Sequence, residues 1–345
     1  MTPKPLRIVY LLEDTPLFGG VKVVLRQANL LVRRGHHVTV VSPGKAPEWF
    51  PLEATFRRTP GLDRKDIPEG DVVVASYWTT LPRALEADRG EVVHYCQGFE
   101  GSYTHNEAEH SAIEEAYSLR VPAMVVSPHL GELLRDRFGR PARVVPQPLE
   151  SSWSPRFRRR PRRVPRILVT SPFEIDWKGV VISLGAIRAM RDAGMDCQLV
   201  RLSQWPLSAE EKAVLEPDEF HEHIAPEEVP SLLRGCDLLL AASWEQEGFG
   251  LPVLEAMASG VPTVVSDISC FRAWAQDAAT FAPVDDVEAF ARQSREILAD
   301  VRRWRAQRRA GLRLAKRYRE ARAARVAEDV LRWVAEGAWR RDLRD

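Results

Sequence analysis

The sequence predicts an α/β protein with two domains, each built on a mostly parallel sheet. Short apolar runs of strand length alternate with helix-length segments, which is typical of βαβ units with helices on both faces of a sheet. This pattern stops in a stretch rich in proline and arginine at 146–165 and then begins again. The 345 residues suffice for two domains, each with a sizeable core.

The first half of the chain contains six apolar runs of strand length. They are Arg7–Leu12, Val38–Val41, Val72–Ala75, Glu91–Tyr95, Ala123–Val126 and Arg143–Val145. Between the first two, apolar residues recur at helical spacing from Val21 to Leu31, and the helix is expected to end near Gly35. We therefore expect a Rossmann-like domain over residues 1–150.

The pattern restarts after the proline-rich stretch. The second set of strands is expected at Arg166–Thr170, Gln198–Leu202, Asp237–Ala241 and Val261–Val265. Helices are expected at Val180–Arg191, Val229–Leu233 and Leu251–Ala258, and the chain from Val287 to Leu343 is expected to be helical. We assign residues 151–165 to a linker, 166–325 to a second Rossmann-like domain and 326–345 to a C-terminal helix that packs back on the body.

Ligands of open parallel sheets bind at the carboxyl ends of the strands. Two such domains therefore predict a site in a cleft between them. The linker holds an arginine cluster (Arg156, Arg158, Arg159, Arg160, Arg162 and Arg163), which we interpret as solvated rather than as a membrane or nucleic-acid patch.

The composition of the chain limits which binding partners and which cellular compartment are expected. The net charge of +1 gives no general attraction to nucleic acid. No apolar run reaches the ~18 residues of a membrane span, and the N-terminus does not read as a signal peptide. The four cysteines are far apart and form no C-x-x-C pair (Cys96, Cys197, Cys236 and Cys270). We expect a cytoplasmic protein, and peripheral contact with the inner membrane face stays open.

The segment from Glu247 to Glu255 carries the strongest chemical signal. Pro252 suits the first turn of a helix, and Gly248 and Gly250 let the backbone approach a ligand closely. A helix that begins near Leu251 would offer its positive end to an anion such as a diphosphate. Either glutamate alone could be a solvated or dipole-complementing residue, but the pair with interleaved glycines is more specific.

This segment resembles the E-x7-E signature of the retaining glycosyltransferases of family 4, which have the GT-B fold. The similarity extends over most of the chain, through the glycine loop Phe18–Val21, the strand–helix order and Ser266–Ile268. It implies that Glu247 contacts the donor sugar and that Glu255 binds the nucleotide ribose. It also implies an N-terminal acceptor domain and a C-terminal domain for the nucleotide-sugar donor.

The resemblance assigns further residues to the donor site. Lys178 is placed to reach the diphosphate, and the remaining candidates are Gly248, Phe249, Gly250, Leu251, Gly19 and Gly20. An arginine typical of the family is missing from 171–177. Arg201 could replace it, although a surface arginine is the simpler interpretation.

The acceptor side is less defined. Gln97 stands where many members carry a catalytic-site histidine. A glutamine can hydrogen-bond a sugar hydroxyl without exchanging protons, so we count Gln97 as catalytic together with Glu247. Glu100, His105 and His110 follow in the same loop as acceptor-side candidates. No metal site and no cofactor are expected.

The expected reaction is metal-independent transfer, with retention, from a nucleoside-diphosphate sugar to a glycan, lipid-linked or small-molecule acceptor. Two other hypotheses remain at this point: a catalytically inactive sugar-nucleotide-binding subunit and a GT-B sugar-nucleotide epimerase. Nucleoside-diphosphate release on incubation with nucleotide sugars separates them from a transferase.

Overall fold

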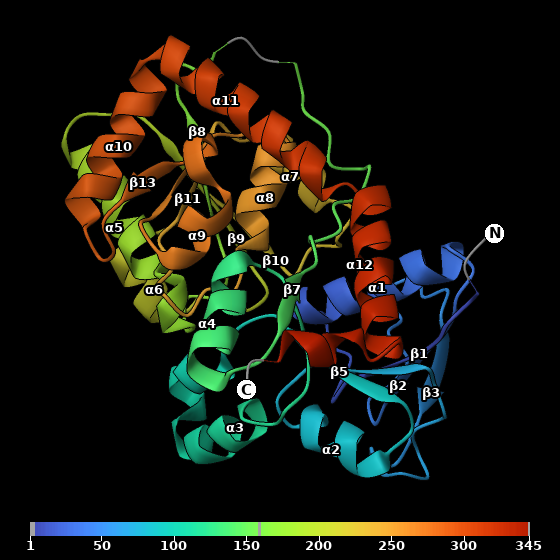
Figure 1. Ribbon diagram of the computed structural model, residues 1–345. Helices are drawn as coiled ribbons and strands as arrows, with labels where there is room; N and C mark the ends of the chain where they lie inside the picture. Colours follow the sequence, from blue (N-terminus) through green and yellow to red (C-terminus); the bar gives the residue numbers. More distant parts are fainter. Residues whose placement is uncertain (1–3, 158–159, 344–345) are drawn as a thin grey trace. The chain divides into compact units, whose positions relative to one another are not determined.

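The computed structural model describes residues 4–157 and 160–343, so Arg158 and Arg159 of the predicted linker lie outside the described residues (Figure 1). The chain divides into two compact units. The first contains the described residues of Met1–Pro148 and Tyr318–Asp345, and the second is Leu149–Arg317. Residues 318–325, which the sequence analysis assigned to the second domain, thus belong with the first unit.

The first unit is a seven-stranded sheet in the order β3-β2-β1-β4-β5-β6-β7. All its neighbouring strands are parallel. The strands are β1 (Arg7–Leu11), β2 (His37–Ser42), β3 (Thr55–Arg58), β4 (Val72–Ala75), β5 (Glu91–Cys96), β6 (Ala123–Val125) and β7 (Ala142–Val144). The helices are α1 (Gly19–Arg33), α2 (Thr80–Ala87), α3 (His110–Tyr117), α4 (Pro128–Phe138) and α12 (Glu320–Ala335), with short 3₁₀ turns at Glu100–Ser102, Thr104–Glu109 and Ala338–Asp342. A further 3₁₀ turn, Lys316–Tyr318, spans the boundary with the second unit.

The second unit is a six-stranded parallel sheet in the order β10-β9-β8-β11-β12-β13. Its strands are β8 (Arg166–Thr170), β9 (Gln198–Ser203), β10 (Glu219–Glu222), β11 (Leu238–Ala241), β12 (Thr263–Ser266) and β13 (Thr280–Ala282). Its helices are α5 (Val180–Asp192), α6 (Ala209–Val214), α7 (Val229–Arg234), α8 (Leu251–Ala258), α9 (Ser269–Trp274), α10 (Val287–Ala299) and α11 (Val301–Ala315), with 3₁₀ turns at Asp176–Lys178 and Gln276–Ala278.

Each sheet has its own apolar core, because the central strands are buried on both faces. In the first unit Val9, Leu11 and Val73 pack against Leu81 of α2. In the second, Ile167 of β8 belongs to the core that includes apolar residues of α5 and α10. The fold class expected from the sequence, two Rossmann-like parallel sheets covered by helices, is confirmed.

The sequence analysis missed the edge strands β3, β10 and β13. Their burial patterns are mostly exposed or intermediate, as in the Thr-Phe-Arg-Arg run of β3. An edge strand is partly exposed to solvent and needs few apolar residues. It is therefore not marked by an apolar run in the sequence.

The C-terminal helix α12 packs on α1 in the first unit, and Glu328 supports this contact. Its carboxylate accepts hydrogen bonds from Arg34 and Arg332 and lies 3.4 Å from Nε2 of His36. Burial raises the pKa of Glu328, but the two arginines outweigh this effect and the pKa is lowered. Glu328 therefore stays a carboxylate in the folded state and ties α12 to the end of α1.

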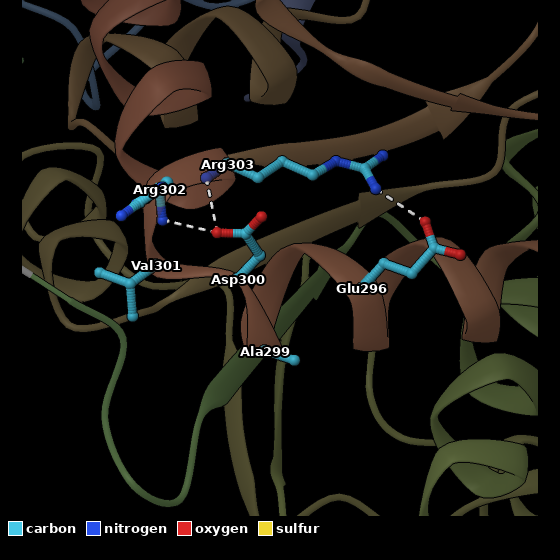
Figure 2. Close-up of a pocket in the computed structure, with 6 residues that line it drawn as sticks. All are labelled: Glu296, Ala299, Asp300, Val301, Arg302 and Arg303. Atoms are coloured by element: carbon cyan, nitrogen blue, oxygen red, sulfur yellow. Dashed lines mark hydrogen bonds and ion pairs between the residues drawn. The ribbon is translucent and has the colours of Figure 1, made fainter.

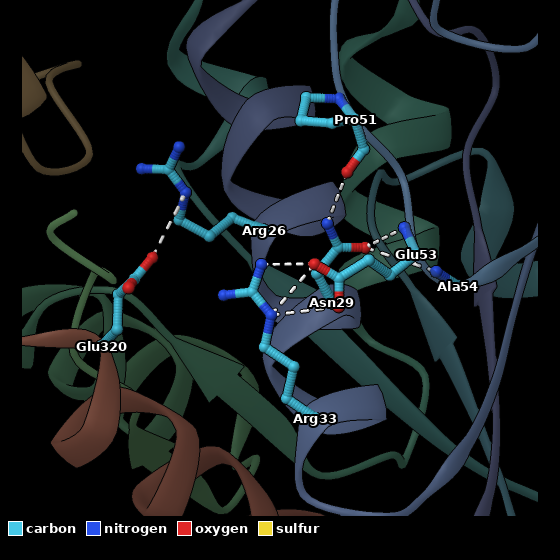
Figure 3. Close-up of polar contacts among 7 residues, drawn as sticks. All are labelled: Arg26, Asn29, Arg33, Pro51, Glu53, Ala54 and Glu320. Carbon is cyan, nitrogen blue, oxygen red and sulfur yellow. Dashed lines mark hydrogen bonds and ion pairs between the residues drawn. The ribbon is translucent and has the colours of Figure 1, made fainter. Parts of the chain in front are cut away.

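The C-terminal half of α1 is held to the segment that precedes β3 (Figure 3). The Asn29 amide donates to the Pro51 carbonyl at 2.8 Å and accepts from the backbone N–H of Glu53 at 2.7 Å and of Ala54 at 3.3 Å. Arg33 binds the Glu53 carboxylate beside it. These contacts fix the course of the chain between β2 and β3.

Within the described residues no helix has both the length and the apolar character needed to cross a membrane.

Candidate functional site

The loop after β8 places Lys178 at the start of α5. The chain turns through Gly179, whose φ of +59° lies in the left-handed region. A Cβ at Gly179 would come within 1.9 Å of the Ala242 carbonyl oxygen, so only glycine fits this close approach. The loop therefore packs directly against the carboxyl end of β11, which fixes the backbone position of Lys178.

The loop after β11 places Glu247 just before α8. Gly250 caps α8 with a φ of +78°, and a Cβ there would lie 2.4 Å from the Phe271 ring. Pro252 occupies the first turn, and the helix begins at Leu251, as predicted. Since the positive end of the helix dipole lies at this terminus, negative charge is favoured beside it.

Lys178 and Glu247 form an ion pair between these two loops. Lys178 Nζ lies 2.7 Å from Glu247 Oε2, and the same oxygen accepts from Ser243 Oγ at 3.0 Å. The other carboxylate oxygen accepts from the Gly250 N–H at 3.0 Å. Nζ also lies 4.1 Å from the centre of the Trp177 ring.

The environment keeps Glu247 ionised. The side chain is buried, which by itself raises the pKa of a carboxyl group. The Lys178 charge, together with hydrogen bonds from Lys178, Ser243 and Gly250, outweighs burial and lowers the pKa of Glu247. A carboxylate is therefore present at neutral pH, held by charge and by three donors.

A small hollow opens beside this ion pair. It lies among the carboxyl ends of β8 and β11 and the start of α8, where open parallel sheets bind ligands. Its lining is Thr170, Ser171, Lys178, Ser183, Leu240, Ala241, Ser243, Glu247, Gly250, Pro252, Val253 and Phe271. The positive helix end, a lysine and several hydroxyl groups make it suited to an anionic, hydroxyl-bearing ligand.

The other residues predicted for the donor site are placed differently. Glu255 is the fifth residue of α8, half-buried and beyond the first turn, and it does not belong to the lining of the hollow. Gly248 is buried and Leu251 is half-buried.

The Phe249 side chain packs against a neighbouring aromatic residue. Its ring stacks on Trp274 with centroids 4.6 Å apart, and Trp274 Nε1 donates to its carbonyl at 2.9 Å. The aromatic side chain is therefore buried, and the ligand contact expected at Phe249 stays a prediction. An apolar ring gains more by stacking on the neighbouring indole than by facing a polar hollow.

Arg201 needs a correction, because it is fully buried rather than on the surface. Its guanidinium pairs with the buried Glu211 and donates to the carbonyls of Val169, Leu202 and Ser171. Ser171, with φ +85°, lines the hollow, and its carbonyl accepts from Arg201 at 2.8 Å. Arg201 thus holds the start of the loop that carries Lys178.

In the first unit, the glycine pair and Gln97 come together. Gly19 and Gly20 open α1, and Gln97 Nε2 donates to the Gly20 carbonyl at 3.2 Å. A Cβ at Gly20 would lie 3.3 Å from that nitrogen, so the contact leaves little room for a side chain. Gln97 is half-buried at the end of β5.

Of the acceptor-side candidates, Glu100 is buried while His105 and His110 are exposed. Burial raises the pKa of Glu100 to about 7, partly offset by a hydrogen bond donated by the Tyr117 hydroxyl. Nearby His94 is fully buried with its ring edge-on to Tyr117, and burial holds its pKa well below the usual value. His94 is therefore a neutral core residue.

Sequence reasoning missed Ser171 and Ser243 of the hollow. Both are hydroxyl residues just beyond the carboxyl end of a parallel strand, β8 and β11. Position after a strand was the available signal, since ligands gather at these ends. However, a lone serine in a loop belongs to no recognisable motif. The contact of Ser243 with Glu247 becomes visible only in the folded structure.

A second hollow, at the junction of α10 and α11, has no such convergence of groups (Figure 2). Asp300 caps α11 by accepting from the N–H groups of Arg302 at 2.8 Å and Arg303 at 3.1 Å. Glu296 pairs with Arg303 at 2.7 Å. Because these charged groups pair with one another or cap the helix, we assign the junction a structural role.

Comparison with known proteins points to the same part of the chain. Residues 164–300 match the sequence model of the family Glycosyl transferases group 1. A GDP-mannose-dependent alpha-(1-6)-phosphatidylinositol dimannoside mannosyltransferase of Mycobacterium tuberculosis is 41% identical over 90 residues, which is 25% of this chain and 23% of the relative. The match thus spans about a quarter of that relative's length.

Solved structures resemble the whole chain. A sucrose-phosphate synthase from Thermosynechococcus elongatus superposes with a TM-score of 0.75 at 15% identity, covering 96% of this chain and 99% of the other. The Anabaena protein HepE, in complex with UDP-glucose, gives a TM-score of 0.75 at 13% identity, covering 94% and 99%. At these identities the likeness shows the fold, which is GT-B.

We predict that Arg201→Leu lowers the free energy of unfolding by about 3–5 kcal/mol, because it leaves the Glu211 carboxylate buried without its partner. Denaturant unfolding measures this loss. Arg272→Leu is the matched control, since it removes an exposed ion pair with Asp267 in the same unit and should cost far less. Equal losses in the two variants would contradict the structural role of Arg201.

Proposed function

We propose that the chain is a retaining glycosyltransferase that moves a sugar from a nucleoside-diphosphate sugar to an acceptor without a metal ion. The observation that carries the proposal is the Lys178–Glu247 ion pair beside the N-terminus of α8. The match of residues 164–300 to group 1 glycosyl transferases supports it. So does the E-x7-E spacing of Glu247 and Glu255.

The ion pair suggests how the donor is bound. A diphosphate in the hollow would meet two sources of positive charge, the Lys178 ammonium and the helix end. Lys178 would then share its donors between the phosphate and Glu247. The hydroxyl-bearing side chains around them are suited to sugar hydroxyls, which are neutral hydrogen-bonding groups.

Glu247 would act on the sugar rather than on the phosphates. Its carboxylate is repelled by the like charge of a phosphate, whereas it can accept hydrogen bonds from hydroxyl groups. As the bond between the anomeric carbon and the phosphate oxygen breaks, positive charge develops on the sugar, and a fixed carboxylate stabilises it. The acceptor oxygen forms the new bond, and the departing phosphate takes the acceptor proton.

Glu255 and Gln97 have supporting roles in this proposal. Glu255 would accept from ribose hydroxyls, as the family resemblance implies, and Gln97 would orient a sugar hydroxyl. The mannosyltransferase relative makes GDP-mannose the first donor to test and a lipid-linked acceptor the first acceptor class.

Substitution of Glu247 and of Glu255 should affect different quantities, turnover in the first case and nucleotide affinity in the second. Glu247→Gln should lower turnover about 100–1,000-fold, since it removes a fixed charge that acts in the transition state. Nucleoside-diphosphate affinity should be maintained or tighten, because Lys178 loses its competing partner. Glu255→Gln should instead weaken that affinity by about 1.5–3 kcal/mol. Turnover and calorimetric affinity are measured on both purified variants, and full transferase activity in Glu247→Gln would refute the mechanism.

Lys178→Ala should weaken nucleoside-diphosphate binding by about 10-fold or more, the worth of a charge-assisted hydrogen bond. It should also raise the pKa of Glu247, because burial then acts with less opposition. Calorimetric titration with the nucleotide measures the affinity. Lys212→Ala is the control, since Lys212 is exposed on α6 of the same unit. An unchanged affinity in Lys178→Ala would remove this lysine from the donor site.

Incubation with GDP-mannose and other nucleotide sugars should release free nucleoside diphosphate, and EDTA should leave the rate unchanged. In this proposal Lys178 and the α8 terminus supply the positive charge that a metal would otherwise bring. The assay is nucleoside-diphosphate release with and without chelator. Loss of turnover in EDTA, restored by a divalent metal, would show that the reaction needs an ion.

A further inference from the structure

The outer face of α11 is a row of arginines. The exposed residues of α11 are Ala306 together with Arg302, Arg305, Arg309 and Arg313. Spacings of three and four put these side chains on one face of the helix. From Arg302 to Arg313 the row is about 16 Å long at the usual rise per residue.

The opposite face of α11 is anchored in the second unit, so the row cannot turn inward. Trp304 Nε1 donates to the Asp237 carbonyl at 3.0 Å, and Gln307 Nε2 donates to the Thr263 carbonyl at 2.7 Å. Gly311 packs against Met257 of α8. Figure 1 shows α11 on the outside of the unit. The arginines are thus presented to solvent by a rigid support.

The segment before β8 adds to this surface. Arg308 of α11 donates to the Arg156 carbonyl at 2.6 Å, which holds that segment beside the helix. Arg156 is exposed, and the next residue, Phe157, is 80% exposed, the highest value among the exposed large apolar side chains. We call Arg302, Arg305, Arg309, Arg313, Arg156 and Phe157 the arginine face. Arg156 was interpreted from the sequence as part of a solvated cluster, and its position beside α11 changes that interpretation.

The charge of this surface is local. Helix α11 has six arginines and no acidic residue, whereas the whole chain has a net charge of +1. The remainder of the chain is therefore net negative. The chain as a whole therefore has no general attraction to anions, and binding of a polyanion needs a local basic patch such as the arginine face.

We propose that the arginine face binds the anionic lipid head groups of a membrane surface. Basic side chains near such a surface contribute about 1 kcal/mol each, and an exposed aromatic ring at the edge of the row suits the boundary between head groups and acyl chains. The choice of a membrane rests on the lipid-linked acceptor of the proposed function, which lies in a bilayer. The surface brings the enzyme to the plane that holds its substrate.

Vesicle co-sedimentation tests the proposal. The full chain is mixed with vesicles of phosphatidylcholine and phosphatidylglycerol in a ratio of roughly seven to three, or of phosphatidylcholine alone. We expect binding to the anionic vesicles, weak binding to the neutral ones, and release at high salt. The variant Arg302→Gln/Arg305→Gln/Arg309→Gln/Arg313→Gln should bind anionic vesicles at least about tenfold more weakly.

A matched control removes the same charge elsewhere. Its four substitutions, each to glutamine, are at exposed positions of the first unit: Arg57, Arg64, Lys65 and Arg135. The control should bind vesicles as the unaltered chain does. Circular dichroism and thermal unfolding establish that both variants fold. Equal loss of binding in the two variants, or none in the α11 variant, would overturn the proposal.

Two further readouts separate this inference from the proposed function and from a nucleic-acid surface. Nucleoside-diphosphate affinity should be unchanged in the α11 variant, whose residues lie outside the donor hollow. Absence of transferase activity with intact vesicle binding would reject the proposed function and leave the arginine face in place. Binding to a short DNA duplex, with no binding to anionic vesicles, would assign the face to nucleic acid and overturn the lipid proposal.

Discussion

The candidate donor site depends on one partly buried ion pair, Lys178 with Glu247. A carboxylate in a buried place is costly unless charge and hydrogen bonds compensate, and here a lysine, a serine hydroxyl and a backbone N–H all serve it. Such a pair is weak evidence for stability, because hydrophobic residues of similar volume often do as well. Its position beside the positive end of α8 indicates a role in ligand binding instead.

The loops that carry the pair are fixed by backbone constraints and not by the pair alone. Gly179 and Gly250 allow approaches to Ala242 and Phe271 that no Cβ would permit. The buried Arg201 of β9 donates a hydrogen bond to the Ser171 carbonyl and so holds the start of the Lys178 loop. A preorganised site needs this kind of support, since catalytic groups lose effect when they can relax away from the reacting atoms.

The central strands, the start of α8 and the helix after Gly179 were predictable, because apolar runs, Pro252 and glycines leave local signals in the sequence. The edge strands were not, since a half-exposed strand such as Thr55–Arg58 has no apolar run. The buried state of Arg201 was also hidden, because it depends on Glu211 and on three carbonyls that only the fold brings near. Glu247 was recognised from its spacing to Glu255, whereas its partner Ser243 required the structure.

A crystal structure of the chain with a bound nucleoside diphosphate tests this donor site directly. We expect the terminal phosphate at hydrogen-bond distance from Lys178 Nζ and against the first turn of α8, with Glu247 facing the space beyond the phosphate where the sugar would lie. A nucleotide bound elsewhere, with Lys178 and Glu247 still paired and their hollow closed to it, would show that this ion pair does not form the donor site.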